Sequence, residues 1–234
     1  MSLRTLLKRD IANREHTIAQ SKHLIDRWRH ELATAPSTLT IPLPRAGVDY
    51  AYGTPDLGRL KAAGNTFICR YLGGDPAKDL TPKEALRLSH AGFDLITVFE
   101  ETAQRALGGL PAGVTDAVHA QELLNKIGAP HAAIYFACDW DVQPDQVPSI
   151  RAYFKGATEQ LGHYRVGVYG GYAVVHELMS LDNIRYGWQT YAWSQGRWTP
   201  HAQLRQIQNG VKLAGVECDL DRAVAADFGQ WRLI

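Results

Sequence analysis

The sequence contains few cysteines, almost no excess of charge of either sign, and no long apolar run. Its three cysteines, Cys69, Cys138 and Cys218, show no CxxC spacing, so neither a disulfide framework nor a zinc site is expected. We interpret them as buried free thiols, because each lies in an apolar stretch. The 25 basic and 24 acidic residues leave a formal net charge of +1, so we expect neither nucleic acid nor a membrane as a partner.

Signals for targeting and for nucleotide cofactors are also missing. The N-terminal segment MSLRTLLKRD is not followed by an apolar signal region, and no run approaches the ~20 apolar residues of a membrane span. We therefore expect no signal peptide and synthesis in the cytoplasm. A role at the cell wall then requires non-classical release, as for a phage lysin or a virion-associated protein. No GxGxxG or GxxxxGK(S/T) loop occurs, and we expect no cofactor.

The N-terminal region differs in pattern from the rest of the chain. Residues 1–34 contain neither Gly nor Pro, and apolar residues recur every seven positions at Ile11, Ile18, Ile25 and Leu32. This spacing predicts a helix of coiled-coil type, with self-association or partner docking through residues 3–32 as its role. The segment 35–46 carries three prolines and predicts an extended linker, which leaves 47–234 as the main domain.

Short apolar runs alternate with helix-like segments in this main domain. The strand candidates are 46–50, 66–72, 93–100, 132–138, 165–170, 186–193, 204–208 and 216–220. The helix-like segments between the first six are 54–63, 81–91, 114–127, 144–161 and 171–181. This alternation predicts a parallel sheet with helices outside it, and eight strands predict closure. Because the last two connections are short, we expect an α/β fold, an irregular (β/α)8 TIM-like barrel with an N-terminal α-helical extension. An open doubly wound sheet is the alternative.

Acidic residues stand at the ends of several predicted strands. Asp49 ends the first strand, Glu100 the third, Asp139 and Asp141 the fourth, and Asp219 the last. The carboxyl ends of barrel strands form the active-site face, so we expect these five catalytic candidates to converge there. Facing carboxylates repel, which raises one pKa and leaves another group ionised, as glycoside hydrolysis requires. A magnesium or calcium site built from the same oxygens is the alternative, although our expectation is that no metal is bound.

Aromatic and amide side chains near these acids suit a carbohydrate. A sugar offers C–H faces that stack on rings and hydroxyls that bind amides and carboxylates. Core packing is the alternative for each ring. The substrate-binding residues that we expect are Arg70, Tyr71, Trp140, Tyr169, Gln189, Tyr191, Trp193, Gln208 and Asp221.

A set of segments in the main domain resembles a known family. In order, they are GVDYAYGTPD, FICRYLGG, LTPKEAL, TVFEET, IYFACDWD, VGVYGGY, WQTYAWS and VECDLDRAVAADFGQW. Together they resemble the bacterial and phage glycoside-hydrolase-like domain known as domain of unknown function 1906, which is similar to the family 25 lysozymes, the N-acetylmuramidases. The resemblance runs from about residue 47 to the C-terminus and does not cover the N-terminal helix.

The resemblance implies roles for four of the acids. Asp49 and Asp219 match the acids of the first and last strands of the muramidase site. Asp139 and Asp141 match an Asp-x-Glu pair whose Glu is the general acid. Because Asp141 is one methylene shorter, its reach to a glycosidic oxygen is reduced, and Glu100 is the candidate replacement.

These observations lead to one main functional hypothesis and two alternatives. The main hypothesis is a muramidase-type glycoside hydrolase that acts on bacterial cell-wall peptidoglycan. The first alternative keeps the cleft but assigns glycan binding without turnover. The second is a virion-associated structural protein whose N-terminal helix makes the contacts.

Overall fold

The computed structural model describes residues 42–180 and 184–233, and the chain from Pro42 onward forms one compact unit. The predicted helix over 1–34 and most of the predicted linker lie outside the described residues. Arg45 and Ala46 fall in that predicted linker but are the first residues of strand β1 (Arg45–Asp49), so the barrel begins earlier than expected. None of the helices in the described part of the chain is long and apolar enough to cross a membrane.

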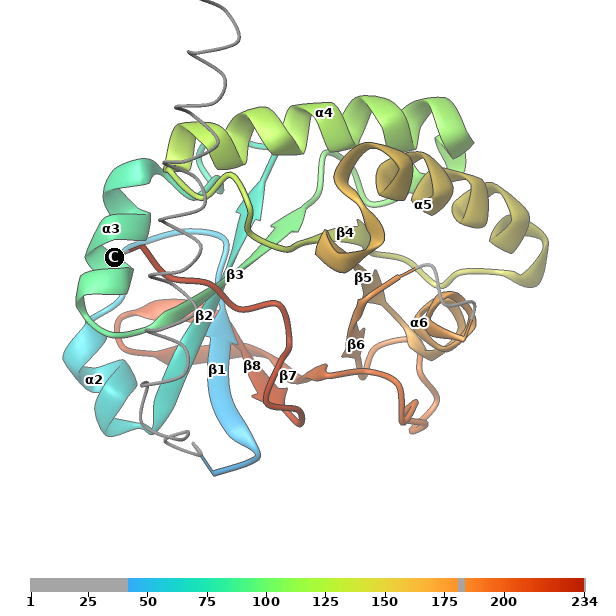
Figure 1. Cartoon of the computed structure of the whole chain (residues 1–234). Coiled ribbons are helices and arrows are strands. Elements are labelled where there is room, and N and C mark those ends of the chain that lie inside the picture. The colour runs from blue at the N-terminus through green and yellow to red at the C-terminus, as the bar shows by residue number, and fades with distance from the viewer. Residues whose placement is uncertain (1–41, 181–183, 234) are drawn as a thin grey trace, which may run out of the picture. The chain divides into compact units, whose positions relative to one another are not determined.

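Eight strands close into a barrel in their sequence order (Figure 1). Neighbouring strands from β1 to β7 are parallel. The predicted α/β barrel is therefore confirmed. The remaining strands are β2 (Asn65–Leu72), β3 (Asp94–Phe99), β4 (Ile134–Cys138), β5 (Val166–Gly170), β6 (Tyr186–Thr190), β7 (Leu204–Leu213) and β8 (Val216–Ala223).

Strand β8 departs from the parallel sheet that we expected, because it runs antiparallel to both β7 and β1. Only Ala214 and Gly215 connect it to β7, and both have positive φ angles, 54° and 88°. A two-residue turn of this kind joins antiparallel strands, whereas a parallel connection needs a dozen or more residues. The direction of the last strand thus follows from the length of its connection.

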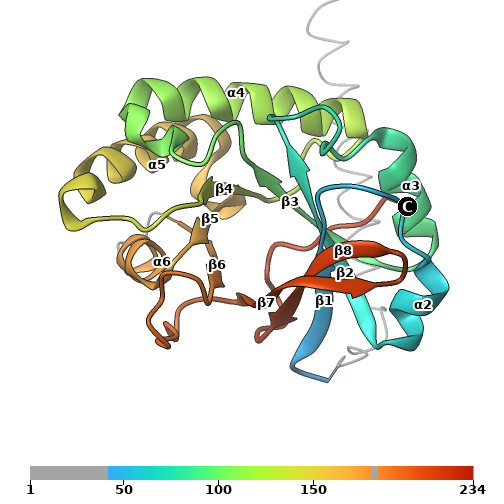
Figure 2. The same ribbon diagram turned by 180° about the vertical axis from the view of Figure 1, so that it is seen from behind.

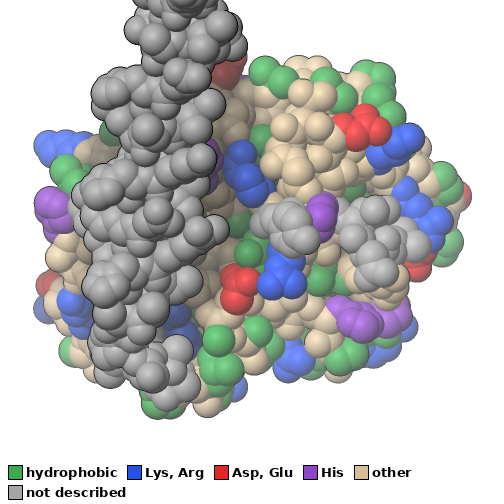
Figure 3. Space-filling model, in the orientation of Figure 1, with side chains coloured by type: hydrophobic (Ala, Val, Ile, Leu, Met, Phe, Trp, Pro, Cys, Tyr) green, Lys and Arg blue, Asp and Glu red, His purple; other side chains and the backbone are tan. Residues whose placement is uncertain are grey.

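Helices cover the outside of the barrel (Figures 1 and 2). They are α2 (Leu57–Ala62), α3 (Pro82–His90), α4 (Gly109–Ile127), α5 (Val147–Leu161) and α6 (Tyr172–Met179). The local sequence explains where α3 begins. The Thr81 side chain accepts a hydrogen bond from the Glu84 N–H, and Pro82 occupies the first turn. Residues 191–203, between β6 and β7, form no helix, as their length predicted. Acidic and basic side chains are interspersed on the surface visible in Figure 3.

The strands separate two apolar cores. Side chains that alternate toward the barrel axis, such as Phe67, Tyr135 and Trp188, fill its interior, while those of opposite parity pack under the helices. Small residues make room for the large rings. A Cβ on Gly167 would lie 2.6 Å from the Tyr135 ring, and one on Gly47 would lie 2.3 Å from the Phe67 ring.

The C-terminal segment closes one end of the barrel. The Tyr135 hydroxyl donates to the Phe228 carbonyl at 2.8 Å, and the Phe228 ring lies 5.0 Å from that of Phe67. Trp231 pairs with Leu95 near the start of β3. This segment therefore covers the amino ends of the strands and leaves the carboxyl ends as the mouth.

Candidate active site

Four of the predicted acids lie at the mouth of the barrel. Asp49 ends β1, while Glu100 and Asp139 directly follow β3 and β4. Glu100 and Asp139 share the inward parity of the buried residues Val98 and Ala137, two positions earlier in each strand. Asp219 pairs with Asp49 across the β1–β8 ladder. Asp219 was expected at a carboxyl end, but β8 is antiparallel and brings its first half to the mouth.

A network of hydrogen bonds links Asp49 and Asp219 through Gln206. Its Nε2 atom donates to Oδ2 of Asp49 at 2.9 Å and to Oδ2 of Asp219 at 3.0 Å. Its Oε1 atom accepts from the Tyr169 hydroxyl at 3.0 Å, and the Tyr71 hydroxyl donates to Oδ1 of Asp49 at 3.0 Å. Tyr71 and Tyr169, which we predicted as site residues, are therefore part of this hydrogen-bond network.

Gln206 was not among the predicted site residues, whereas its neighbour Gln208 was. The structure buries Gln206 and exposes Gln208. A register irregularity in the β7–β8 ladder separates the two residues, so β7 loses its simple alternation there. The buried Leu204 sets the inward parity that Gln206 follows, and this signal could have identified it from the sequence.

The two acids that follow β3 and β4 have raised pKa values. Burial, and then the charge of Asp139, raise the pKa of Glu100 to about 7. Burial also raises the pKa of Asp139, while Lys78 and a hydrogen bond with Tyr169 oppose that rise. Glu100 therefore retains a proton near neutral pH. Lys78, which we did not predict, places its ammonium 5.3 Å from the centre of the Tyr71 ring.

The loop after β3 is fastened on both sides of Glu100. The Glu100 N–H donates to the Leu72 carbonyl at 3.0 Å, and the Asp139 N–H donates to the Ala103 carbonyl at 3.2 Å. Arg105 then binds the buried Asp116 through two nitrogen atoms at 3.0 and 2.8 Å. These contacts fix the backbone that carries the two carboxylates.

A second carboxyl pair lies deeper in the barrel. Burial, and then the charge of Asp219, raise the pKa of Asp49 to about 6. Burial and the Asp49 charge hold the pKa of Asp221 well above its ordinary range. Oδ1 of Asp221 accepts from Trp188 Nε1 at 2.9 Å, while its buried Oδ2 finds a partner in Asp49 when it carries a proton. Asp221, predicted as a sugar ligand, is thus an interior neighbour of Asp49.

Three predicted binding residues have the opposite strand parity and face away from the barrel axis. Arg70 is buried and bound to Glu84, with Nε 3.0 Å from Oε1. Trp140 packs in the outer core and donates to Gln146 at 2.9 Å. Gln189 is fully buried and binds Ser194 Oγ at 3.0 Å and the Thr199 N–H at 2.8 Å. Their interactions stabilise loops and helices around the site.

The other predicted residues lie on exposed positions after the strands. Asp141 is exposed, and its backbone carbonyl accepts from Gln143. Tyr191 and Trp193 follow β6 with 44% and 39% of their surface exposed. The Trp193 Cβ approaches Gly171, directly after β5, so its ring belongs to the rim of the mouth. Tyr52, 53% exposed after β1, is a further rim aromatic that we did not predict.

The magnesium or calcium alternative gains no support from the geometry. Within residues 42–180 and 184–233, no group of three or more His, Cys, Asp or Glu side chains is arranged to hold a metal ion. Two of the four acids, Asp49 and Asp219, are instead engaged by neutral donors, namely the Gln206 amide and the Tyr71 hydroxyl. What the arrangement offers chemically is a proton donor next to ionisable carboxylates.

Solved structures share this barrel. The Tat-secreted protein Rv2525c of Mycobacterium tuberculosis, in complex with L-tartrate, has a TM-score of 0.73 and 29% identity over 80% of this chain and 98% of that chain. The catalytic domain of endolysin ply40 from bacteriophage P40 of Listeria monocytogenes has a TM-score of 0.51 and 15% identity over 79% of this chain and 94% of its own. A lysozyme from Streptomyces coelicolor has a TM-score of 0.50 and 12% identity over 77% and 92%.

The last two likenesses establish the fold alone. No protein with a curated description matches the sequence. A family model described as "Rv2525c-like, glycoside hydrolase-like domain" matches residues 58–225. The resemblance to a glycoside-hydrolase-like barrel is therefore confirmed, and the chain belongs to the Rv2525c-like glycoside hydrolase-like domain family.

Proposed function

We propose that this protein is a glycosidase that hydrolyses the glycan strands of bacterial peptidoglycan. The observation that carries the proposal is the pairing of Glu100, whose pKa is raised to about 7, with Asp139 at the same mouth. Glycosidases need one protonated and one ionised carboxyl group on either side of the scissile bond. The structural likeness to lysozyme and endolysin barrels supports this reaction class.

In this proposal Glu100 is the general acid. It protonates the glycosidic oxygen, while the ionised Asp139 stabilises the oxocarbenium-like transition state. Lys78 lowers the pKa of both acids, whereas the hydrogen bond with Tyr169 favours the ionised form of Asp139 and so distinguishes it from Glu100. The half-buried Asp219 holds the sugar in place, while the buried Asp49 fixes the Gln206 amide that binds Asp219.

The rim supplies the remaining requirements for a sugar ligand. Tyr52, Tyr191 and Trp193 present exposed rings around the acids, and sugar C–H faces stack on such rings. The balanced net charge of +1 suits a polymer whose backbone is neutral. Because the similar mycobacterial protein is Tat-secreted, we propose that this protein also acts outside the cytoplasm, at the cell wall.

One observation favours a second candidate, a glycan-binding module without turnover. Asp141, which matches the muramidase general acid, is exposed and one methylene short. If Glu100 does not replace it, the mouth retains its aromatic rim and hydrogen-bonding groups but has no proton donor. The two candidates share the ligand and differ in the reaction.

Zymography on purified bacterial cell walls separates the two. A cleared zone, with new reducing ends in the soluble fraction, identifies the glycosidase. Sedimentation of the protein with the walls, without clearing or reducing ends, identifies the binding module. Neither clearing nor sedimentation with any peptidoglycan tested would refute the peptidoglycan assignment.

A further inference from the structure

A cavity of about 450 Å³ lies beside α3, between the loops that follow β1 and β2. Its walls include Arg70, Asp79, Lys83, Glu84 and Arg87. This cavity is separate from the hydrogen-bonded acids at the mouth, and the proposed glycosidase reaction uses none of its side chains.

The charges of these walls do not balance. Arg70 and Glu84 neutralise each other, with nitrogen–oxygen distances of 3.0 and 3.3 Å. Neither Lys83 nor Arg87 forms an ion pair within the described residues, and the only side-chain hydrogen bond of either there is from Arg87 to the Pro55 carbonyl at 3.5 Å. These two cations stand four positions apart on one helix, an arrangement whose repulsion disfavours the helix.

Neither Asp79, the remaining acid in the cavity wall, nor helix α3 cancels the excess positive charge of the cavity. Burial raises the pKa of Asp79, while the nearby backbone N–H groups of Gly73 and Gly74 oppose that rise. The first turn of α3, which begins after Thr81, also borders the cavity. Pro82 has no N–H and Thr81 accepts that of Glu84, so the Lys83 N–H is the backbone donor left at this positive helix end, which favours an anion. An anion would relieve the Lys83–Arg87 repulsion as well.

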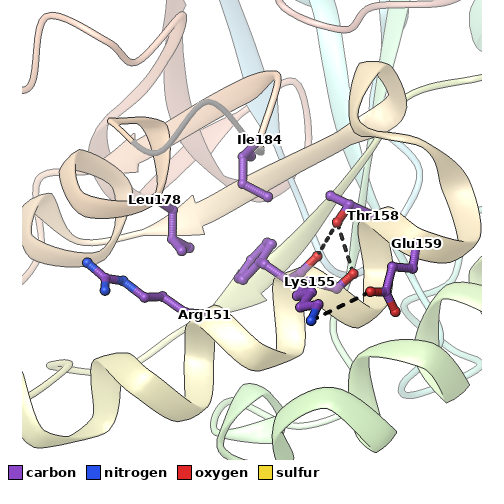
Figure 4. Close-up of a pocket in the computed structure, with 7 residues that line it drawn as sticks. Arg151, Lys155, Thr158, Glu159, Leu178 and Ile184 are labelled. Atoms are coloured by element: carbon purple, nitrogen blue, oxygen red, sulfur yellow. Dashed lines mark hydrogen bonds and ion pairs between the residues drawn. The ribbon is translucent and has the colours of Figure 1, made fainter.

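The cavity between α5 and α6 provides a contrast (Figure 4). It holds about 310 Å³ and also contains two basic side chains, Arg151 and Lys155. There each cation has an acidic partner, Glu177 for Arg151 and Glu159 for Lys155 at 3.9 Å. Of these two cavities, the one beside α3 is therefore the one whose cations are left unpaired.

The cavity beside α3 and the acids at the mouth share the loop after β2. Asp79 in this loop lines the cavity and pairs with Tyr71, whose hydroxyl binds Asp49. The neighbouring Lys78 lies over the Tyr71 ring and acts on the charges of Glu100 and Asp139. The cavity therefore opens among the loops at the carboxyl ends of β1 and β2, on the same face of the barrel as the mouth.

We infer that this cavity is an anion subsite that binds the carboxylate of a peptide carried by the glycan at the mouth, through Lys83 and Arg87. The inference rests on the proposed function, because peptidoglycan is a polysaccharide with carboxylate-bearing peptides attached. A phosphate group on another wall polymer has related chemistry, and the experiment separates the two sources.

The test measures binding of the full chain, carrying Glu100→Gln so that the wall is not consumed. The two ligands are intact peptidoglycan and glycan strands from which an amidase has removed the peptides. Lys83→Glu combined with Arg87→Gln should weaken binding to intact peptidoglycan by about tenfold and leave binding to stripped glycan unchanged. Lys126→Glu, on the exposed face of α4, is the matched control and should change neither.

Three results would overturn the subsite. One is an equal loss on both ligands with an unchanged thermal transition, and another is no loss on either. The third result has two parts: inorganic phosphate displaces intact peptidoglycan from the protein, and the affinity does not change when the peptides are removed. This result would assign the cavity to a phosphate polymer.

A failure of the proposed function is distinguishable from a failure of the subsite. If the wild-type chain neither binds nor cleaves stripped glycan, the glycosidase proposal fails. Titration with the free acidic dipeptide L-alanyl-γ-D-glutamate then tests the subsite alone. Saturable binding that the Lys83 and Arg87 substitutions abolish supports it, and no binding refutes it.

Discussion

The Nε2 atom of Gln206 lies 2.9 Å from Oδ2 of Asp49, although 157 positions separate the two residues in the sequence. The other hydrogen of the same amide reaches Asp219 at 3.0 Å. A neutral donor between two carboxylates lessens their mutual repulsion and satisfies an oxygen of the buried Asp49. The mouth of the barrel is therefore organised around an uncharged residue.

Removing this amide should destabilise the fold. We expect Gln206→Ala to lower the free energy of unfolding by about 1–3 kcal/mol, because it leaves buried carboxylate oxygens without donors. Urea unfolding followed by tryptophan fluorescence measures the change. Gln208→Ala, two positions further along β7 and exposed, is the control and should stay close to wild type. Equal stability of the two variants would mean that the network contributes nothing.

Glu100→Gln should abolish hydrolysis while preserving binding to cell walls. A general acid acts chiefly in the transition state, so the rate should fall by about 10²–10⁴-fold with little change in affinity. Release of reducing ends and wall sedimentation measure the two effects. Glu101→Gln alters the adjacent, more exposed carboxylate, which pairs with Arg105 at 2.7 Å, and should retain activity. Loss of activity in Glu101→Gln but not in Glu100→Gln would assign the general-acid role to Glu101.

The rate of hydrolysis should fall as the pH rises through about 7. The pKa of Glu100 is raised to about 7, so its carboxyl carries the catalytic proton below that pH and loses it above. On the acid side the rate should fall when Asp139, whose pKa is also raised, becomes protonated. A profile of kcat/KM against pH records both limbs. A rate that still rises between pH 7 and 9 would contradict the assignment.

Asp141 offers a direct comparison with the muramidase resemblance. Because its side chain is exposed, we expect Asp141→Asn to leave the rate near the wild-type value. Asp141→Glu restores the length of the muramidase donor and should raise the rate only if this position supplies the proton. The same reducing-end measurement applies to both variants. Inactivity of Asp141→Asn together with an active Glu100→Gln would return the acid role to Asp141.

Residues 42–234 should fold without the N-terminal region. Every strand of the closed barrel lies within this range, and β1 begins at Arg45. We therefore expect deletion of residues 1–41 to leave the thermal midpoint unchanged. Differential scanning calorimetry of both chains provides the comparison. Deletion through residue 49 removes β1 and serves as the positive control for unfolding.

The positions of Asp49, Glu100 and Asp139 could be predicted because each ends an apolar strand, and strand order alone brings such ends to one face. Alternation also predicts that Tyr71 points inward and Arg70 outward, although both were expected to bind substrate. The contribution of Lys78 was not predictable, since a lysine in a loop reaches many positions with its flexible side chain.

The direction of β8 was the part of the fold that the strand pattern did not supply. Apolar runs indicate strands but not their polarity, and the only local signal is the brief Ala214-Gly215 connection. Asp219 reached the mouth for a reason different from the predicted one. Because β8 is antiparallel, its first half lies at the mouth, where the parallel strands place their last residues.

The covering of the barrel floor by the C-terminal segment determines how the protein can be handled. Leu233 donates its N–H to the Ser89 hydroxyl, and Arg232 binds Asp94 at 2.7 Å, so the last described residues are held beside α3 and the start of β3. A fluorophore, affinity tag or surface tether joined after these residues would emerge from the side opposite the acids. Immobilised through that point, the protein would present its mouth to an insoluble polymer.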